Sequence, residues 1–283
     1  MSLGDYIKAR RLGEASYKAH LEEGSYPYLQ VLDEILNHVT IVSETLLKEK
    51  EIPVERIRGT YAAGRRTAFA PNFMPLLEDT TEFGEKWSFL FDSLKKEGIR
   101  EPVKCYEYMN HYYIIEGNKR VSVMKYLGAE TIPARVTRLV PRFEPTKACI
   151  SYYEFLEFYK KCPENYMIFS EPGAYQKFMF RCWKRPEDGW TEEEIKDLKS
   201  NYYRFKQAYR RVHPQAEENT NVNVADVFLS YLNVYAYKQI QEKSTDQMVS
   251  ELRAMEEELN LQESGKNVKL LLEEDVYHYH GYT

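Results

Sequence analysis

The sequence predicts an α+β protein, in which one mixed sheet-and-helix module is flanked by helices. Residues 102–116 alternate apolar and polar side chains as a β-hairpin does. Apolar residues recur at helical spacing near the N-terminus and again beyond Pro141. We therefore expect four segments: an N-terminal helical segment at 1–38, an α+β module at 39–140, a helical domain at 141–263 and a C-terminal tail at 264–283.

The first segment holds two predicted helices. Ser2 and Asp5 are spaced as a capping box, and apolar residues at helical spacing follow them. A turn at 24–27 separates this helix from a second one, which has three leucines on one face: Leu29, Leu32 and Leu36. From Val39 to Ile57 the pattern changes to that of short strands and a turn.

A long loop and the hairpin follow in the module. Residues 59–77 contain two glycines and two prolines, which predicts a loop, and loops of this length are often functional. We expect its apolar residues, Phe69, Phe73 and Met74, to hold it to the core. A helix around Trp87 should end near Gly98, before the hairpin turns at 109–111.

The predicted helical domain has three clear helix starts. Thr191 with Glu194 forms a capping box, Asn223 is placed to cap a helix over 224–240, and Thr245 begins the last helix. That last helix carries a narrow apolar stripe of Met248, Leu252, Met255 and Leu259. A protein partner or self-association through the 245–262 helix is therefore one interpretation.

Composition excludes several function classes. The net charge of −5 and a pI of about 5.8 do not suit a chain that binds polyanions over its whole surface. No run of about 18 apolar residues exists, and the N-terminus lacks the apolar stretch of a signal peptide, so we expect a cytoplasmic protein without a membrane segment. The four cysteines form no CxxC pair, which favours free thiols over a metal site.

The stretch IIEGNKRVSVMKYLGA, residues 114–129, is the strongest local signal. A strand that stops at Glu116-Gly117 and a helix that opens on Asn118-Lys119-Arg120 expose unpaired N–H groups beside two cations. Such a turn suits phosphate binding, most naturally of a nucleotide. The alternative is structural, with Glu116 simply pairing with Lys119 or Arg120.

Four ordered pieces resemble the N-terminal domain of the ParB/sulfiredoxin superfamily. They are IPVERIRGT at 52–60, the arginine-bearing loop at 65–66, SLKKEGIREPVKCYE at 93–107 and YYIIEGNKRVSVMKYLGAETIPARV at 112–136. Other pieces, such as YPYLQVLDEIL, are similar to a bacterial group whose longer relatives carry a nucleoside-binding domain like that of the basic membrane proteins. The resemblance implies a ParB/sulfiredoxin-like domain with nucleotide-related function.

The resemblance also implies site residues. The G-x-x-R turn would hold nucleotide phosphates with Gly117, Asn118, Lys119 and Arg120, aided by Arg65 or Arg66 from the earlier loop, and Arg120 would contribute most. Ser122 lies one turn beyond Asn118 and would either reach a phosphate or be solvated. Glu116 stands where related serine kinases carry an acid, so it would support Mg²⁺ or act as a base, or else neutralise Arg120.

Differences between this sequence and the family's motifs exclude some of the family's functions. Sulfiredoxin needs a cysteine where this chain has Asn118, so sulfiredoxin chemistry is excluded. No helix-turn-helix is recognisable after residue 150, which argues against DNA as a partner that is read in the way ParB proteins read it. The basic run YYRFKQAYRR suits a solvated helix at least as well as a nucleic-acid surface. We therefore expect a nucleotide-binding sensor or regulatory module; the alternatives are a nucleotide-dependent kinase or hydrolase and a DNA-binding regulator.

Overall fold

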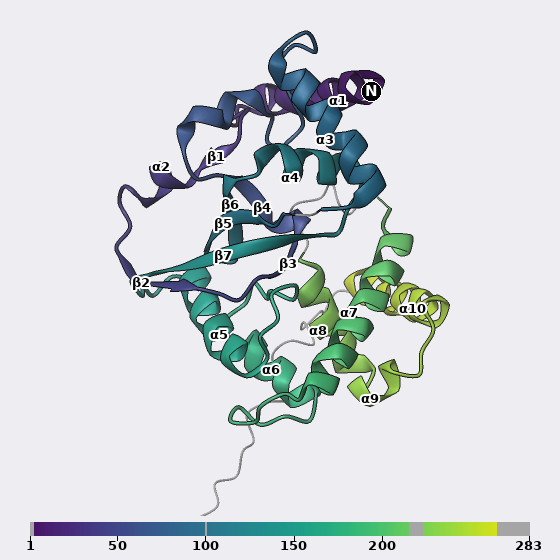
Figure 1. Ribbon diagram of the computed structural model, residues 1–283. Helices are drawn as coiled ribbons and strands as arrows, with labels where there is room; N and C mark the ends of the chain where they lie inside the picture. The colour runs from purple at the N-terminus through teal and green to yellow at the C-terminus, as the bar shows by residue number, and fades with distance from the viewer. Residues whose placement is uncertain (1–2, 100, 215–222, 265–283) are drawn as a thin grey trace, which may run out of the picture. The chain divides into compact units, whose positions relative to one another are not determined.

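The computed structural model describes residues 3–99, 101–214 and 223–264, with the side chains of the last helix described to residue 258 (Figure 1). The chain divides into two compact units, Met1–Ile168 and Phe169–Thr283. Unit 1 contains a mixed sheet with helices, and the described part of unit 2 is helical, which confirms the predicted α+β class.

The elements of unit 1 follow in chain order. They are α1 (Leu3–Glu22), β1 (Gln30–Val31), α2 (Leu32–Leu36), β2 (Ile41–Leu46), β3 (Lys50–Pro53), the 3₁₀ turn η1 (Val54–Arg56), β4 (Ile57–Thr60), the 3₁₀ turn η2 (Ala63–Ala68), α3 (Glu82–Glu97), β5 (Val103–Tyr108), β6 (His111–Glu116), α4 (Asn118–Tyr126), β7 (Thr131–Pro141) and α5 (Lys147–Lys161).

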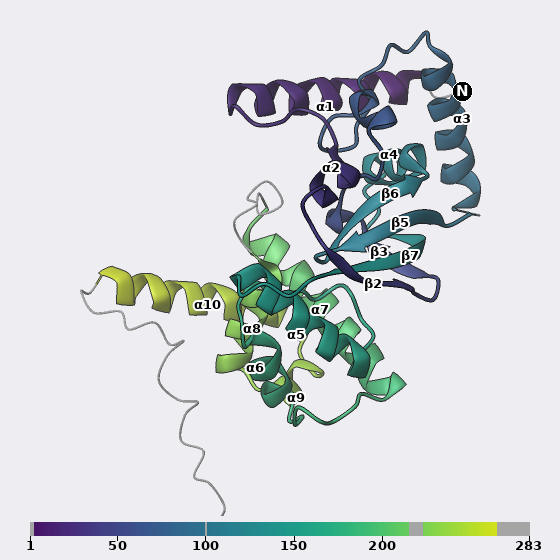
Figure 2. The ribbon, with the colours of Figure 1, turned by 90° about the vertical axis from the view of Figure 1, so that its left-hand side faces the viewer.

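The strands form one seven-stranded sheet in the order β1-β4-β6-β5-β7-β2, and β3 also pairs with β7. The pairs β1–β4, β4–β6 and β5–β7 are parallel, and the other pairs are antiparallel. Parallel neighbours cannot be joined by a tight hairpin, and the parallel strands β5 and β7 are joined through β6 and α4. Helix α4 begins two residues after β6 ends, so the start of α4 lies at the end of that strand (Figure 2).

The predicted hairpin is confirmed as β5 and β6. Met109 and Asn110 form a two-residue loop in which both residues have positive φ, 51° and 63°. Such a turn matches the twist of the two strands, and Asn tolerates this conformation better than most residues. The Asn110 N–H donates to the buried Glu107 carboxylate at 2.8 Å, which fixes the loop.

Aromatic side chains form the core between the sheet and helices α1, α3 and α4. Trp87 of α3 is fully buried; its ring stacks on Phe91 at 5.6 Å and meets the edge of Tyr6 from α1 at 5.5 Å. Phe69 and Phe73 are buried in the same core, as the sequence predicts for the long loop. The loop is therefore fixed where it passes the start of α4.

A buried ion pair connects α5 to the sheet. Glu107 of β5 and Arg138 of β7 form a hydrogen-bonded pair, and their side chains are 1% and 7% exposed. The Tyr152 hydroxyl donates to Glu107 at 3.4 Å, while the rings of Phe155 and Tyr159 lie against the Arg138 guanidinium. Sequence reasoning placed α5 in a separate helical domain, but these contacts pack it against the sheet of unit 1.

Two predicted helices differ from the structure. The helix expected around Leu29, Leu32 and Leu36 is only the five-residue α2, because Gln30–Val31 pairs with β4 as strand β1. The helix expected over 224–240 is interrupted after Val234. There Tyr235 has an extended conformation, and a short separate helix begins at Tyr237.

Unit 2 contains five helices within its described residues. They are α6 (Ala174–Arg181), α7 (Glu192–Val212), α8 (Val224–Val234), α9 (Tyr237–Ile240) and α10 (Thr245–Ser264). The predicted Thr191–Glu194 capping box and the Asn223 cap are both present. Along α10, Met248 and Leu252 are fully buried, so this half of the apolar stripe is not available to a partner; the Leu259 side chain lies outside the described residues.

Candidate functional site

The turn between β6 and α4 requires a glycine. Gly117 has φ +112° and ψ +20°, which residues with side chains rarely adopt. A Cβ added there would lie 2.7 Å from Cγ1 of Val103, so the position has no room for a side chain. The first hydrogen bond of α4 runs from the Val121 N–H to the Gly117 carbonyl. The N–H groups of the three preceding helical residues therefore point out of the helix end.

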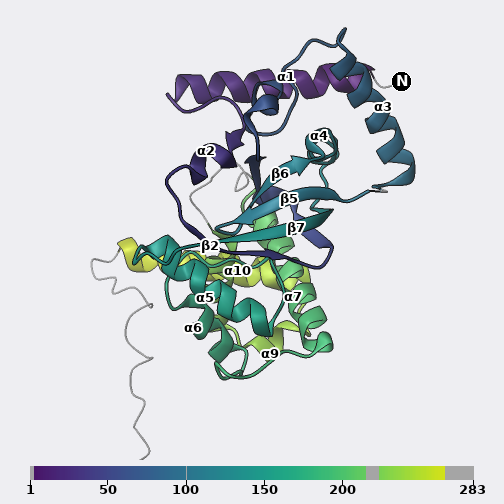
Figure 3. The ribbon, with the colours of Figure 1, turned by 60° about the vertical axis from the view of Figure 1, so that its left-hand side comes forward.

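Three cations from three elements lie near enough to this helix end for the charges of two of them to act on the third. Arg65 comes from η2, Lys86 from α3 and Lys119 from α4, and α3 and α4 lie side by side (Figure 3). The pKa of Lys119 is lowered, first by burial and then by the charges of Lys86 and Arg65, whereas Glu82 opposes the shift. Glu82 pairs with Lys86. Two positive charges and one negative charge thus act on Lys119 at the start of α4.

Lys119 is held in place by an aromatic ring. Its ammonium lies 4.4 Å from the ring centre of Phe83 on α3. Phe83 is buried, so the contact fixes the stem of Lys119 near the helix end. Arg65 is exposed and forms no ion pair with any described residue, which leaves its guanidinium available.

Asn118 connects the turn to strand β4. Its Nδ2 donates to the Thr60 hydroxyl at 3.3 Å, and that hydroxyl donates to the Ile114 carbonyl at 3.1 Å. The Asn118 Oδ1 atom is buried and has no hydrogen-bond partner among the described residues. A buried acceptor of this kind is normally satisfied by water or a ligand donor.

Arg120 has a mainly structural environment. Its Nη1 donates to the carbonyl oxygens of Glu101 and Pro102, at 2.5 and 3.1 Å, and its side chain is 16% exposed. Its Nη2 lies 3.8 Å from the Glu116 carboxylate. These contacts agree with the structural alternative, because a guanidinium already holding two carbonyls has fewer donors for a phosphate.

Glu116 is exposed at the end of β6 and pairs with Lys104 at 2.6 Å. The hydrogen bond and the charge of Lys104 lower its pKa, and Arg120 adds to the effect. A general base that works near neutral pH needs a raised carboxyl pKa. The geometry therefore favours the reading in which Glu116 neutralises neighbouring cations.

Two of the predicted residues lie elsewhere. Ser122 is fully buried, and its hydroxyl accepts a hydrogen bond from Trp87 Nε1 at 2.9 Å, so it is neither solvated nor directed toward a phosphate. Packing on more than one side of α4 explains this correction, because the consecutive residues Val121, Ser122 and Val123 are all buried. Arg66 pairs with Glu34 at 2.5 Å. Arg65 forms no such pair with a described residue, so the two arginines have different roles.

Sequence reasoning missed Lys86 and Thr60. Lys86 lies one helical turn after Glu82 on α3, and nothing in its local sequence indicates that it approaches Lys119. Thr60 ends β4, which runs parallel to β6, so its approach to Asn118 depends on sheet pairing. A signal for either residue would have required knowledge of the tertiary fold.

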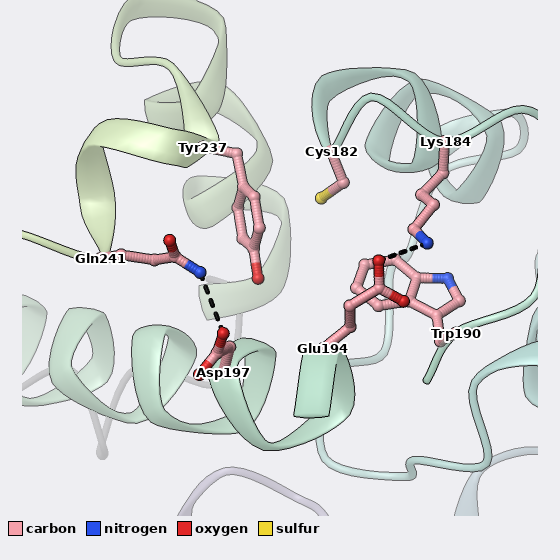
Figure 4. A pocket seen from close by; sticks show the side chains of 7 residues that line it. All are labelled: Cys182, Lys184, Trp190, Glu194, Asp197, Tyr237 and Gln241. Atoms are coloured by element: carbon pink, nitrogen blue, oxygen red, sulfur yellow. Dashed lines mark hydrogen bonds and ion pairs between the residues drawn. The ribbon is translucent and has the colours of Figure 1, made fainter. Parts of the chain in front are cut away.

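Unit 2 has a small cavity between α6, α7 and α9 (Figure 4). Its volume is about 50 Å³, and it is lined by Cys182, Lys184, Trp190, Glu194, Asp197, Tyr237 and Gln241. Pockets that bind small molecules and cofactors have volumes of roughly 300–1,000 Å³. This cavity is therefore too small for a nucleotide and suits a few water molecules.

The basic run in α7 is largely used within unit 2. Arg204 donates to the carbonyls of Ile240, Gln241 and Lys243, and Arg211 pairs with Asp246 at 2.7 Å. These contacts connect α7 to the chain around α9 and α10. The run therefore has a structural role that the sequence pattern did not reveal.

Other site classes find no support in the described parts of the chain. None of the described helices is long and apolar enough to cross a membrane. The described residues bring no three His, Cys, Asp or Glu side chains together as metal ligands. All four cysteines are buried free thiols, in agreement with the sequence analysis.

Comparisons with known proteins found a similarity over part of unit 1. Residues 40–148, which run from just before β2 to the start of α5, match the family model of the ParB N-terminal domain. Among solved structures, the chain is similar to a crystal structure of sulfiredoxin from Arabidopsis thaliana, with 24% identity over 32% of this chain and 84% of that chain. The TM-score of 0.23 is too low to support an argument from shape. No curated protein matches the chain. Residues 40–148 of this chain are therefore similar to a ParB N-terminal domain.

Proposed function

We propose that unit 1 binds a nucleotide through its phosphates at the start of α4 and acts as a regulatory module. The observation that carries the proposal is that Lys119, at the start of α4, packs on Phe83 of α3 at 4.4 Å from its ring centre, where the charges of Lys86 and Arg65 help to lower the pKa of Lys119. Like charges repel, so a fold that brings them together gains energy when an anion binds between them. Free N–H groups and the helix dipole act in the same direction.

Each group in this site has a distinct role. The N–H groups at the start of α4 would bind phosphate oxygens, and Lys119 and Arg65 would neutralise their charge. Lys86 would remain partly paired with Glu82 when the nucleotide is bound, because the two side chains lie four residues apart on the same helix. Mg²⁺, where it accompanies the nucleotide, would be held chiefly by phosphate oxygens and water.

Binding without turnover fits Glu116 better than catalysis does. A carboxylate with a lowered pKa, paired with Lys104, is a poor general base. We therefore propose a sensor role for this module in preference to a kinase or hydrolase. Release of inorganic phosphate from ATP, CTP, GTP or UTP by the purified protein would contradict that preference.

Thermal unfolding against ATP, CTP, GTP and UTP, with and without Mg²⁺, tests the proposal. A ligand at a hundredfold excess over its Kd stabilises the folded state by about 2.7 kcal/mol, so a specific nucleotide should raise the Tm. Lys119→Gln and Arg65→Gln should each weaken binding by about tenfold, equivalent to about 1.4 kcal/mol. Arg66→Gln is the matched control, because Arg66 is paired with Glu34 and should leave affinity nearly unchanged.

Two results would refute the proposal. One is the absence of binding for all four nucleotides at millimolar concentration. The other is binding that Lys119→Gln and Arg65→Gln do not weaken, which would place the ligand away from the start of α4. Inorganic triphosphate as a competitor then separates phosphate recognition from base recognition, since it should displace the nucleotide only if phosphates carry the affinity.

A further inference from the structure

The end of helix α6 in unit 2 displays two large aromatic side chains to solvent. Trp183 is 73% exposed and Phe180 is 69% exposed. The opposite side of the helix is buried through Tyr175, Phe178 and Met179. These two exposed rings are therefore not part of the core of unit 2, and packing does not explain them.

The backbone at Trp183 makes its presence more unusual. The Trp183 N–H donates to the Phe180 carbonyl and the Lys184 N–H donates to the Met179 carbonyl, which is the hydrogen-bond pattern of a Schellman C-terminal cap. Trp183 occupies the left-handed position of this cap, with φ +60°. Glycine is the usual residue there, because a side chain makes that conformation costly.

A bulky residue at this position lowers stability without filling the core in return. The compensation visible in the structure is the ammonium of Lys238 on α9, which lies 5.7 Å from the Trp183 ring centre. Positions that break a local rule without a packing gain are expected at functional surfaces. The Trp183 ring is thus held outward by the cap at an energetic cost to the fold.

Positive charge surrounds the two rings. From Gly173 to Arg185 the chain carries four cations and no acidic residue. Lys177 precedes Phe180 by three residues and Arg181 by four, which is helical neighbour spacing, and Lys238 adds a third charge from α9 beside Trp183. Lys177, Arg181 and Lys238 form no ion pair within the described part of the chain. An anionic partner with flat apolar groups would match this surface.

We propose that this aromatic surface, defined by Lys177, Phe180, Arg181, Trp183 and Lys238, binds single-stranded nucleic acid. Exposed rings stack on unpaired bases, whatever the sequence, and adjacent cations bind the phosphate backbone. Two rings beside three unpaired cations provide both parts of that recognition. A bilayer is a poorer match, because membrane affinity scales with buried apolar area and the rest of the apolar side of α6 faces the core.

Fluorescence anisotropy with the full-length chain and a labelled oligothymidylate of about 12 nucleotides tests the proposal. The wild-type protein should bind, with affinity that falls as salt rises. Trp183→Gly and Phe180→Ser should each weaken binding by about tenfold, and Lys177→Gln with Arg181→Gln should reduce the salt dependence. Phe89→Ala is the aromatic control, because Phe89 is 62% exposed on α3 of unit 1. Lys18→Gln is the charge control.

Melting of the same variants separates binding from folding. Trp183→Gly should melt at the wild-type temperature or higher, because glycine relieves the left-handed position, and should still lose binding. Lys119→Gln should leave oligonucleotide affinity unchanged. A failure of this proposal can therefore be distinguished from a failure of the nucleotide proposal for unit 1. Unchanged oligonucleotide affinity in Trp183→Gly would overturn the proposal. So would tighter, Trp183-dependent binding to polyglutamate or to phosphatidylserine vesicles.

Discussion

The Nη1 atom of Arg120 donates to the backbone carbonyl of Glu101 at 2.5 Å, so the arginine of the G-x-x-R motif holds the entry to strand β5. A second bond to the Pro102 carbonyl strengthens this link. Arg120→Ala should therefore destabilise the fold by about 1.5–3 kcal/mol, the range for charge-assisted hydrogen bonds. Urea unfolding measures the loss, and Arg120→Lys should recover only part of it because one ammonium cannot span both carbonyls.

Ligand affinity distinguishes this role from direct phosphate contact. We expect Arg120→Ala to change nucleotide affinity less than Lys119→Gln does, when both are measured by calorimetry below their melting temperatures. The opposite order, with normal stability in Arg120→Ala, would return Arg120 to the primary role that the family motif implies.

Gly117 should tolerate no side chain. Alanine there would have an unfavourable φ of +112° and a Cβ only 2.7 Å from Val103 Cγ1. Gly128→Ala is the matched control, because Gly128 also has positive φ, +71°, but has open space around it. Gly128→Ala should cost about 1 kcal/mol from backbone strain, and Gly117→Ala should cost roughly 1–3 kcal/mol more. Equal losses in urea unfolding would show that Val103 moves aside freely.

Ser122 should matter for stability and not for ligand binding. Ser122→Ala removes the acceptor of the buried Trp87 indole N–H and should cost about 1–3 kcal/mol. Ser88→Ala provides a close comparison, since the Ser88 hydroxyl is equally buried but has no hydrogen-bond partner among the described residues. That variant should be nearly neutral. A drop in nucleotide affinity for Ser122→Ala without a loss of stability would contradict this assignment.

The contrast between Gly117 and Lys86 shows what local sequence can predict. Gly117 follows a strand and precedes a helix, so its turn and the hairpin before it depend on neighbours in the chain, and both were predictable. Lys86 reaches Lys119 only because α3 packs beside α4, and Ser122 turns inward only because Trp87 lies above it. Likewise, α5 belongs with the sheet through the Glu107–Arg138 pair, and no spacing in the sequence reveals that contact.

The Glu107–Arg138 pair allows a double-mutant cycle in the core. Glu107→Leu leaves Arg138 buried without its partner, and Arg138→Met does the same to Glu107, so each should cost about 3–5 kcal/mol. The double variant Glu107→Leu with Arg138→Met removes both charges and should be closer to the wild type than either single variant. Urea unfolding of the variants gives the coupling energy. Additive losses would show that the two side chains act independently.

His111 gives the clearest pH dependence. It begins β6, and its Nδ1 lies 2.9 Å from the Met109 carbonyl. Burial, together with the charges of Arg56 and Arg58, lowers its pKa from 6.5 to about 4. A histidine whose pKa is lowered by folding contributes stability that is fully present above its unfolded pKa. That stability is lost as pH falls from about 6.5 toward 4, because the unfolded chain then binds the proton first.

The expected loss across this range is about 3 kcal/mol, from 1.36 kcal/mol for each unit of pKa change. Carboxyl groups elsewhere in the chain also titrate below pH 5. The stability of the wild type must therefore be compared with that of His111→Gln, which keeps a polar side chain and cannot gain a proton. Urea unfolding of both proteins at several pH values between 4 and 7 should show that the wild type loses stability relative to His111→Gln as pH falls, because only the wild type loses the histidine contribution. Parallel curves would mean that His111 titrates at the same pH in the folded and unfolded chains.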